Sequence, residues 1–274
     1  MIKKDGSNLV IIIGAMKSGT TSLFKFMSQH PNIIATKRTE THFFSKNFEK
    51  GLDFYNTLWP VIETENKLYL EATPGYYKSH IHEEIPEKIY KCYPKAKLLY
   101  ILRDPIKRLE SNYRQYINDS GNMEGINKHL PEDLIQSSMY YYQIEKFLPF
   151  FEKEQIQVIR TIDLNKNPLE TLHGVCRFLE IELYDFKDIN VKYGDARVTN
   201  TNVYQNLRKI KLLKALVKNI PQGFKYSIIR KVSSGERIDN ELWKLNDSNR
   251  EKFRKQFLED NKGMLSEFNI DVLE

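Results

Sequence analysis

Short apolar runs alternate with amphipathic segments along most of the chain. The first run, 10–13, is β-branched and ends at Gly14, and helix-forming residues follow from about Thr20 to Gln29. Runs of strand length recur at 68–70, 97–102 and 157–160. Helical patterns are predicted at 83–90, 105–116, 134–151 and 168–179, and nearer the C-terminus at 204–219 and 247–261.

The alternation of strands and helices predicts the fold class. Strands joined by helices form a mostly parallel sheet, because right-handed crossovers place the helices on its two faces. We therefore predict an α/β protein of three layers, with a central sheet flanked by helices and a helical C-terminal part. Ligands of such folds bind beyond the carboxyl ends of the strands. No repeat, linker or low-complexity segment divides the chain, so residues 1–274 are predicted to form a single domain.

Composition narrows the classes of protein and partner. With 41% hydrophobic and 28% charged residues, the chain can bury a core, which excludes a disordered protein. The 42 basic and 36 acidic residues give a net charge of +6 without dense basic runs, which favours a small anionic ligand over nucleic acid. The apolar run 9–15 is far shorter than the roughly 20 residues of a transmembrane helix, so none is predicted. Cys92 and Cys176 are too few for a disulfide framework, and we expect a cytoplasmic protein.

A glycine-containing loop joins the first strand to the first helix. In this position, backbone N–H groups and a helix dipole can bind phosphate. The pattern G-x-x-x-x-G-K-[ST] of nucleoside triphosphatases is matched at Gly14, Gly19 and Thr21. Its lysine position holds Thr20, however, and Lys17 lies three residues earlier. The loop therefore predicts a P-loop-like fold, but not an ordinary nucleotide hydrolase.

The strand at 97–102 offers a second phosphate contact. It is followed by Arg103, at the place where a nucleoside triphosphatase carries an aspartate for magnesium. A helix then begins at Pro105, and Ser111 lies in its second turn. The Arg103 guanidinium and the Ser111 hydroxyl can therefore converge on one phosphate through charge-assisted hydrogen bonds. The alternative is an arginine paired with a surface carboxylate and a solvated serine.

Two motifs resemble the nucleotide-binding signatures of sulfotransferases. They are K-S-G-T-T-S at 17–22 and R-D-P-x-x-R-x-x-S-x-Y at 103–113, and T-I-D-L-x-x-N-P at 161–168 resembles a later family segment. Members of this family use 3′-phosphoadenosine 5′-phosphosulfate (PAPS) as sulfuryl donor. The resemblance implies that the loop binds the 5′-phosphosulfate, that the Arg103 segment binds the 3′-phosphate and that a C-terminal loop closes on the nucleotide. The implied cofactor-binding residues are Lys17, Ser18, Gly19, Thr20, Thr21, Ser22, Arg103, Ser111 and Arg197.

Lys17 is also a candidate catalytic residue. A sulfuryl group in transfer carries less negative charge than a phosphoryl group, so one lysine can stabilise the leaving phosphate oxygen without magnesium. The five histidines other than His42 have no cysteine or carboxylate at zinc-like spacing, and H-x-H at 80–82 is weak evidence alone. We therefore predict PAPS as co-substrate and no metal site.

Glu40 is the candidate base that removes the acceptor's proton. It lies in T-E-T-H-F-F at 39–44, which resembles the K-E-x-H-F-F element of glycan sulfotransferases, where the glutamate is the catalytic base. Thr39 replaces the lysine of that element. His42 is the alternative base, because imidazole titrates near neutral pH and other branches of the family use histidine. Otherwise His42 orients or contacts the substrate.

The acceptor side is expected near a second resembling segment. L-E-A-T-P-G-Y-Y at 70–77 resembles the family's E-K-T-P-x-Y-F segment, which borders the acceptor, with Ala72 at the lysine position. Tyr76 and Tyr77 are candidates to stack on a sugar or other ring, although aromatic residues after a turn more often belong to the core. Loss of the lysine favours a less anionic acceptor.

These observations together predict a magnesium-independent, PAPS-dependent sulfotransferase. Its acceptor is a hydroxyl or amine of a small polar metabolite, such as an alkaloid of secondary metabolism, or of a glycan, and we favour the small metabolite. One alternative is a P-loop nucleotide or small-molecule kinase, which would need magnesium and a lysine at position 20. The other is a non-catalytic nucleotide-binding module, against which the presence of both Lys17 and Glu40 argues.

Overall fold

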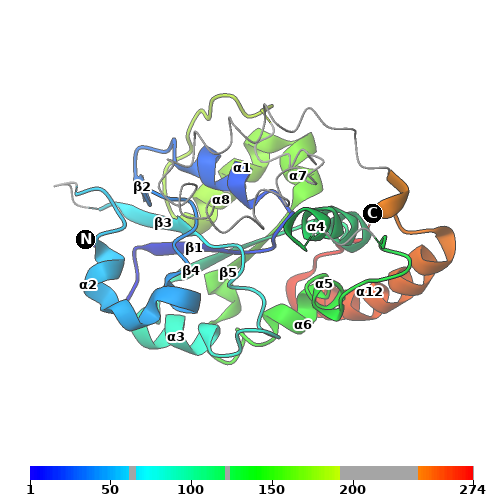
Figure 1. Cartoon of the computed structure of the whole chain (residues 1–274). Coiled ribbons are helices and arrows are strands. Elements are labelled where there is room, and N and C mark those ends of the chain that lie inside the picture. The colour runs from blue at the N-terminus through cyan, green and yellow to red at the C-terminus, as the bar shows by residue number, and fades with distance from the viewer. Residues whose placement is uncertain (62–65, 121–123, 192–239, 274) are drawn as a thin grey trace, which may run out of the picture.

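The centre of the molecule is a parallel β-sheet (Figure 1). The computed structural model describes residues 1–61, 66–120, 124–191 and 240–273, and within them the sheet has five strands in the order β2-β3-β1-β4-β5. Every neighbouring pair among these strands is parallel, which confirms the predicted sheet. The strands are β1 (Leu9–Gly14), β2 (Ile33–Ala35), β3 (Leu68–Ala72), β4 (Lys97–Leu102) and β5 (Ile156–Arg160).

The register of the sheet places two loops side by side. β1 lies in the middle and pairs with β3 on one side and β4 on the other. Gly14, the last residue of β1, lies opposite Tyr100 near the end of β4. Because parallel strands end at the same edge of a sheet, the segments that follow β1 and β4 meet there.

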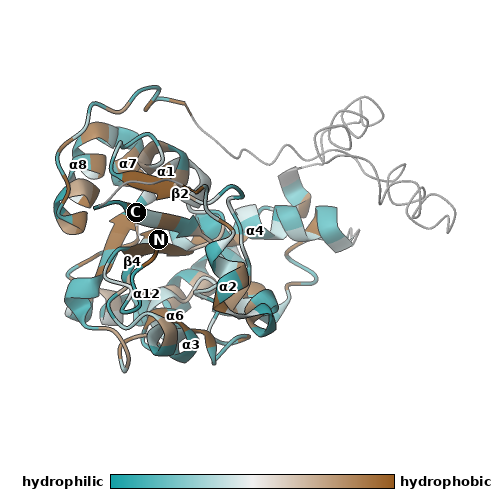
Figure 2. Ribbon diagram, turned by 90° about the vertical axis from the view of Figure 1, so that its left-hand side faces the viewer, coloured by the Kyte–Doolittle hydropathy of each residue, from teal (hydrophilic) through white to brown (hydrophobic). Residues whose placement is uncertain are grey.

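Helices cover both faces of the sheet (Figure 1). Val10 and Ile12 of β1 pack in a cluster with residues of α1 and α8, whereas Ile11 and Ile13 pack in a cluster that contains residues of α3, α6 and α12. This burial on two faces explains why β1 has a continuous apolar run. In Figure 2 the hydrophobic colour is concentrated in the strands between helices of mixed hydropathy. The helices are α1 (Thr20–Met27), α2 (Gly51–Asn56), α3 (Ile85–Cys92), α4 (Pro105–Ser120), α5 (Glu132–Gln136), α6 (Tyr140–Ile144), α7 (Thr161–Lys166), α8 (Pro168–Leu179) and α12 (Asp247–Phe268).

The helix predicted at 134–151 is wrong as a single element, since the structure has the short helices α5 and α6 followed by turns. The break falls at Met139, whose backbone is extended (φ −89°, ψ 92°). Contacts from distant parts of the chain accompany it. The Arg108 guanidinium donates a hydrogen bond to Ser138 Oγ, and the Asp260 carboxylate accepts two from backbone N–H groups of α6.

Other differences concern boundaries and short elements. α3 begins and ends two residues later than predicted, and α4 and α12 extend to Ser120 and Phe268. β2, α2 and α7 were not predicted. α12 confirms a helical C-terminal part, whereas the predicted helix at 204–219 lies outside the described residues. Within the described ranges, no helix is both long and apolar enough to span a membrane.

Candidate active site

The loop between β1 and α1 has a backbone that suits an anion. Gly19 has φ 98° and Lys17 has φ 70°, both in the left-handed region that favours glycine. A Cβ at Gly14 would lie 2.5 Å from the Tyr77 ring, so close packing also requires that glycine. The first turn of α1 contains no acidic residue. The N–H groups at its start therefore present positive potential to the space in front of the helix.

Arg103 and Ser111 approach the same space from the next strand and helix. Arg103 follows the last residue of β4, and Ser111 lies on α4. Both line a cavity of about 790 Å³ together with the loop. The structure thus brings together nine residues that the sequence singled out: Lys17, Ser18, Gly19, Thr20, Thr21, Ser22, Glu40, Arg103 and Ser111. Arg197, the other predicted nucleotide contact, lies outside the described residues.

Basic side chains dominate the charge of the cavity. Burial lowers the pKa of the Lys17 ammonium from its usual 10.5, and three nearby arginines lower it further: Arg114, Arg103 and Arg108. The repulsion between these positive charges falls when an anion binds between them. The cationic residues of the wall are Lys17, Arg103, Lys107, Arg114, Lys166 and Lys244, and its acidic residues are Glu40 and Glu110.

Glu110 ties the C-terminal part of the chain to this wall. Its side chain is only 2% exposed and forms ion pairs with Lys244 (2.7 Å) and Arg250 (2.6 Å). It also accepts a hydrogen bond from the backbone N–H of Leu245 (3.2 Å). Sequence reasoning missed this contact because its partners lie more than 130 residues further along the chain.

The side chains of Glu40 and His42 are in polar contact at the edge of the cavity. The distance from His42 Nε2 to Glu40 Oε2 is 3.1 Å, and the two side chains are 37% and 51% exposed, respectively. Glu40 lines the cavity. His42 does not line the cavity, and its imidazole contacts the Glu40 carboxylate. A carboxylate in this position can accept a proton from a molecule bound in the cavity.

Buried polar groups hold the backbone beside Glu40. The Thr73 hydroxyl oxygen accepts hydrogen bonds from the backbone N–H groups of Thr41 (3.1 Å) and His42 (3.2 Å). The Thr41 hydroxyl donates to the carboxyl group of Glu71, which is fully buried. Burial raises the pKa of Glu71 to about 7, although hydrogen bonds to its carboxylate form act in the opposite direction.

Tyr76 and Tyr77 do not reach the cavity, which corrects their predicted role in stacking on the acceptor. Both are fully buried in the core cluster on the α3 side of the sheet. The Tyr76 hydroxyl oxygen accepts a hydrogen bond from the backbone N–H of Phe44 (3.1 Å), and the Tyr77 hydroxyl donates to the carbonyl oxygen of Ser137 (2.8 Å). The turn after β3 thus directs both rings into the core.

Groups that could ligate a metal ion or form a disulfide were also considered in the sequence. Within the described residues, no group of three or more His, Cys, Asp or Glu side chains is arranged to hold a metal ion. Cys92 and Cys176 are both free thiols. Arg108 lies in the second motif but was given no role, and in the structure it is fully buried.

A parallel sheet whose central strand ends in a glycine-containing loop, beside a basic cavity with one exposed carboxylate, defines a protein of P-loop-like fold. Comparison with family models then specifies the family. The chain belongs to the sulfotransferase domain family, whose model matches residues 7–262.

Curated relatives of the chain include glycan sulfotransferases. It is 30% identical over 190 residues to heparan sulfate glucosamine 3-O-sulfotransferase 5 of Homo sapiens, a match that covers 62% of this chain and 53% of the relative. It is also 30% identical over 183 residues to the 3B1 enzyme of the same kind from Homo sapiens, covering 63% of this chain and 46% of the relative. The chain thus spans about half the length of the curated relatives it matches.

Solved structures share the fold. A sulfotransferase from Alicyclobacillus acidocaldarius superposes with a TM-score of 0.66 at 20% identity, covering 96% of both chains. A mouse sulfotransferase superposes with a TM-score of 0.53 at 13% identity, covering 93% of this chain and 85% of that one. The predicted P-loop-like α/β fold is therefore confirmed.

Proposed function

We propose that this chain is a sulfotransferase that moves a sulfuryl group from PAPS to an acceptor and releases adenosine 3′,5′-bisphosphate (PAP). One observation carries the proposal: the loop with Lys17, the residues Arg103 and Ser111, and Glu40 line the same cavity. Membership of the family supports the reaction. The mouse sulfotransferase of similar fold was solved in complex with PAP, which supports the donor.

The residues of the cavity fit this donor. PAPS has anionic groups on both its 5′ and 3′ oxygens, and the cavity has two sets of anion-binding groups, the loop and the pair Arg103 and Ser111. When bound, PAPS supplies an activated sulfuryl group. Lys17 carries a partly buried positive charge in the loop, and its ammonium would stabilise the negative charge that the leaving phosphate oxygen gains during transfer.

Glu40 is the residue to which we assign proton removal. Its carboxylate lines the cavity, whereas His42 contacts that carboxylate through Nε2. An imidazole in this place keeps the Glu40 side chain in one orientation. Thr41 and Thr73 fix the backbone on the other side of Glu40, so the base is held at both its side chain and its main chain.

For the acceptor we propose a hydroxyl group of a glycan. The curated relatives are named as sulfotransferases of heparan sulfate glucosamine. A small polar metabolite is the second candidate, because Ala72 supplies no charge at a position where the resembling family segment has a lysine. Our predicted compartment remains the cytoplasm, on the basis of the two free thiols.

The test is transfer of label from [35S]PAPS by the full chain. We expect labelled product with desulfated heparan sulfate, and a panel of phenols, alkaloids and amines tests the second candidate. Parallel reactions with [γ-32P]ATP and magnesium test the kinase alternative. Tight binding of PAP without transfer to any acceptor would favour a non-catalytic module, and preference for ATP over PAP would refute the proposal.

A further inference from the structure

The backbone on both sides of Lys17 is held by side chains. Lys17 has φ 70°, a backbone conformation that a non-glycine residue keeps only where its surroundings fix it. The carbonyl oxygens of Met16 and Ser18, which flank Lys17, each accept a hydrogen bond from a side chain of another element. The donors are Arg108 of α4 and Thr161 at the start of α7.

Arg108 connects the loop to α5. Its guanidinium is fully buried, and Nε donates a hydrogen bond to the Met16 carbonyl oxygen (3.1 Å). Nη1 donates to the carbonyl oxygen of Leu134 (3.3 Å) and to Ser138 Oγ (2.8 Å). The planar, forked arrangement of N–H groups allows one arginine to bridge two elements, which a lysine cannot reproduce.

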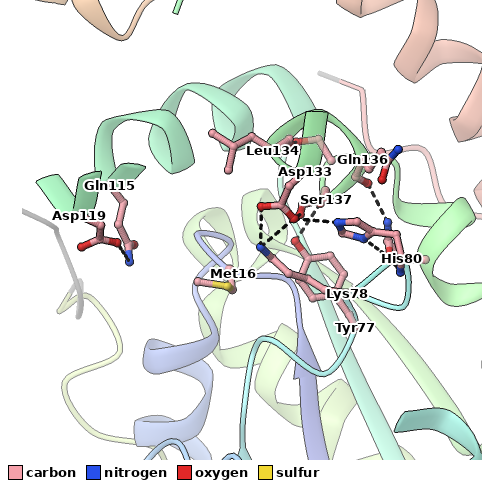
Figure 3. Close-up of polar contacts among 12 residues, drawn as sticks. Met16, Tyr77, Lys78, His80, Gln115, Asp119, Asp133, Leu134, Gln136 and Ser137 are labelled. Atoms are coloured by element: carbon pink, nitrogen blue, oxygen red, sulfur yellow. Dashed lines mark hydrogen bonds and ion pairs between the residues drawn. The ribbon is translucent and has the colours of Figure 1, made fainter. Parts of the chain in front are cut away.

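The α5 side of this bridge is itself fixed (Figure 3). The Asp133 carboxylate, in the first turn of α5, accepts hydrogen bonds from Lys78 Nζ (3.3 Å) and His80 Nε2 (2.8 Å). The Tyr77 hydroxyl donates to the Ser137 carbonyl oxygen at the other end of the same helix (2.8 Å). Arg108 therefore joins the loop to α5, a helix that is itself fixed by hydrogen bonds at both of its ends.

Arg108 has no carboxylate partner in the part of the chain that the structure describes, although its guanidinium lies over the Tyr77 ring, 5.8 Å from the ring centroid. Among the described residues, its Nη2 is buried without a hydrogen-bond acceptor. Buried charges in proteins are normally paired, because desolvation of an unpaired charge is costly. The positive charge of Arg108 also contributes to the lowered pKa of Lys17, so the two cations act on the same region.

Thr161 holds the other side of the loop. Its hydroxyl contacts the carbonyl oxygens of Ser18 and of Leu102 at the end of β4 (2.7 Å for Leu102). Thr161 also lines the cavity. It thus links the loop to the strand that leads to Arg103, the residue proposed to contact the 3′-phosphate.

We propose that Arg108 and Thr161 are positioning residues for the 5′ group of the donor, which hold Met16 and Ser18 so that the Lys17 backbone and ammonium face that group. The negative charge on the 5′ group is in turn the missing counter-charge of Arg108. The inference rests on the proposed function, since it takes PAPS as the ligand of the loop. In this scheme both residues act through the loop: Arg108 does not line the cavity, and the Thr161 hydroxyl is engaged with the carbonyl oxygens of Ser18 and Leu102.

Three nucleotides separate this role from a general structural one. PAP has both phosphates, 3′-AMP lacks the 5′-phosphate and 5′-AMP lacks the 3′-phosphate. The ratio of the Kd of 3′-AMP to the Kd of PAP measures the affinity that the 5′-phosphate adds, which we call the 5′ gain. The ratio of the Kd of 5′-AMP to the Kd of PAP measures the affinity that the 3′-phosphate adds, which we call the 3′ gain. We expect Arg108→Gln and Thr161→Val each to reduce the 5′ gain about tenfold, as loss of a hydrogen bond to a charged or loop group implies. Arg108→Gln is expected to leave the 3′ gain unchanged. Thr161→Val is expected to reduce the 3′ gain less than the 5′ gain, because the Thr161 hydroxyl also contacts Leu102, next to Arg103.

Conservative variants sharpen the test. Thr161→Ser keeps the hydroxyl and is expected to retain the wild-type 5′ gain. Arg108→Lys keeps the charge but not the fork, so it is expected to retain only part of that gain. Ile89→Val shortens a fully buried side chain of α3 that does not line the cavity, and controls for general loss of stability.

Each result has a distinct consequence. If the wild-type chain does not prefer PAP to both monophosphates, the proposed function fails. If it does, and the 5′ gain survives in both Arg108→Gln and Thr161→Val, the positioning role is refuted. An equal fall of the 5′ and 3′ gains in these variants also refutes it, since that is the result of general destabilisation. Should Arg108→Gln fail to fold, Thr161→Val and Thr161→Ser decide the question.

Discussion

Replacing Glu71 by glutamine tests how a buried carboxyl group behind the Glu40 segment affects stability. Glutamine has nearly the same shape and can still accept the hydrogen bond from the Thr41 hydroxyl, but it does not titrate. The wild-type side chain is fully buried in the strand β3, and no ion pair neutralises it among the described residues. The substitution therefore removes a titration and leaves the packing almost unchanged.

The magnitude follows from the pKa of Glu71, which burial raises from 4.5 to about 7. Between these two values the unfolded chain releases the proton while the folded protein keeps it. The folded state then binds more protons than the unfolded state, so the free energy of unfolding falls as pH rises through this window. At 1.36 kcal/mol for each pH unit between 4.5 and 7, the loss is about 3 kcal/mol.

The assay is urea denaturation of both proteins from pH 4.5 to pH 8. The difference in unfolding free energy, wild type minus Glu71→Gln, is expected to fall by about 3 kcal/mol over this range. Asp5→Asn is the matched control: the pKa of Asp5 is lowered to about 2, chiefly by a hydrogen bond from the Ser7 backbone, so its contribution is complete before pH 4.5 is reached. A difference for Glu71→Gln that stays constant with pH would refute the reasoning.

Three further predictions concern the cavity. Lys17→Ala is expected to lower kcat by about 10²-fold or more and to have a smaller effect on PAP binding, because the ammonium acts on charge that develops during transfer. Single-turnover rates, measured together with the Kd of PAP, check this prediction. Arg103→Ala is expected to lose the preference for PAP over 5′-AMP, and calorimetry showing an unchanged preference would contradict its assignment to the 3′-phosphate. Glu40→Gln is expected to lower kcat by about 10²- to 10⁴-fold, and His42→Ala by less, since only Glu40 lines the cavity. The reverse order of the two effects in steady-state assays would transfer the base role to His42.

The sheet and its layers were predictable because their pattern is local. β1 and β4 are buried on both faces, so each is a continuous apolar run that stands out from its surroundings. The break between α5 and α6 was not predictable, because contacts from Arg108 and Asp260 accompany it, and these residues come from other parts of the chain. β2 has three residues, too few for any periodicity.

The candidate site likewise has parts that the local sequence predicts and parts that depend on distant residues. The loop with Lys17 and the segment with Arg103 each follow a recognisable strand, and neighbouring parallel strands then bring them together. For Tyr76 and Tyr77 the sequence left both stacking on the acceptor and packing in the core open, because nothing in the local sequence says on which side of a turn an aromatic ring packs. The ion pairs of Glu110 depend on residues far along the chain, so no spacing rule could indicate them.

The central place of β1 has a consequence for biosynthesis. This strand is made first, yet both of its neighbours, β3 and β4, come later, the second ending only at Leu102. At about 5–20 residues per second, the ribosome needs about 4–18 s to go from Gly14 to Leu102. For that time the apolar segment of β1 lacks one or both partners and is open to wrong pairings with other nascent chains. We therefore expect chaperones bound at the ribosome exit to engage this N-terminal segment and to release it once β4 has emerged.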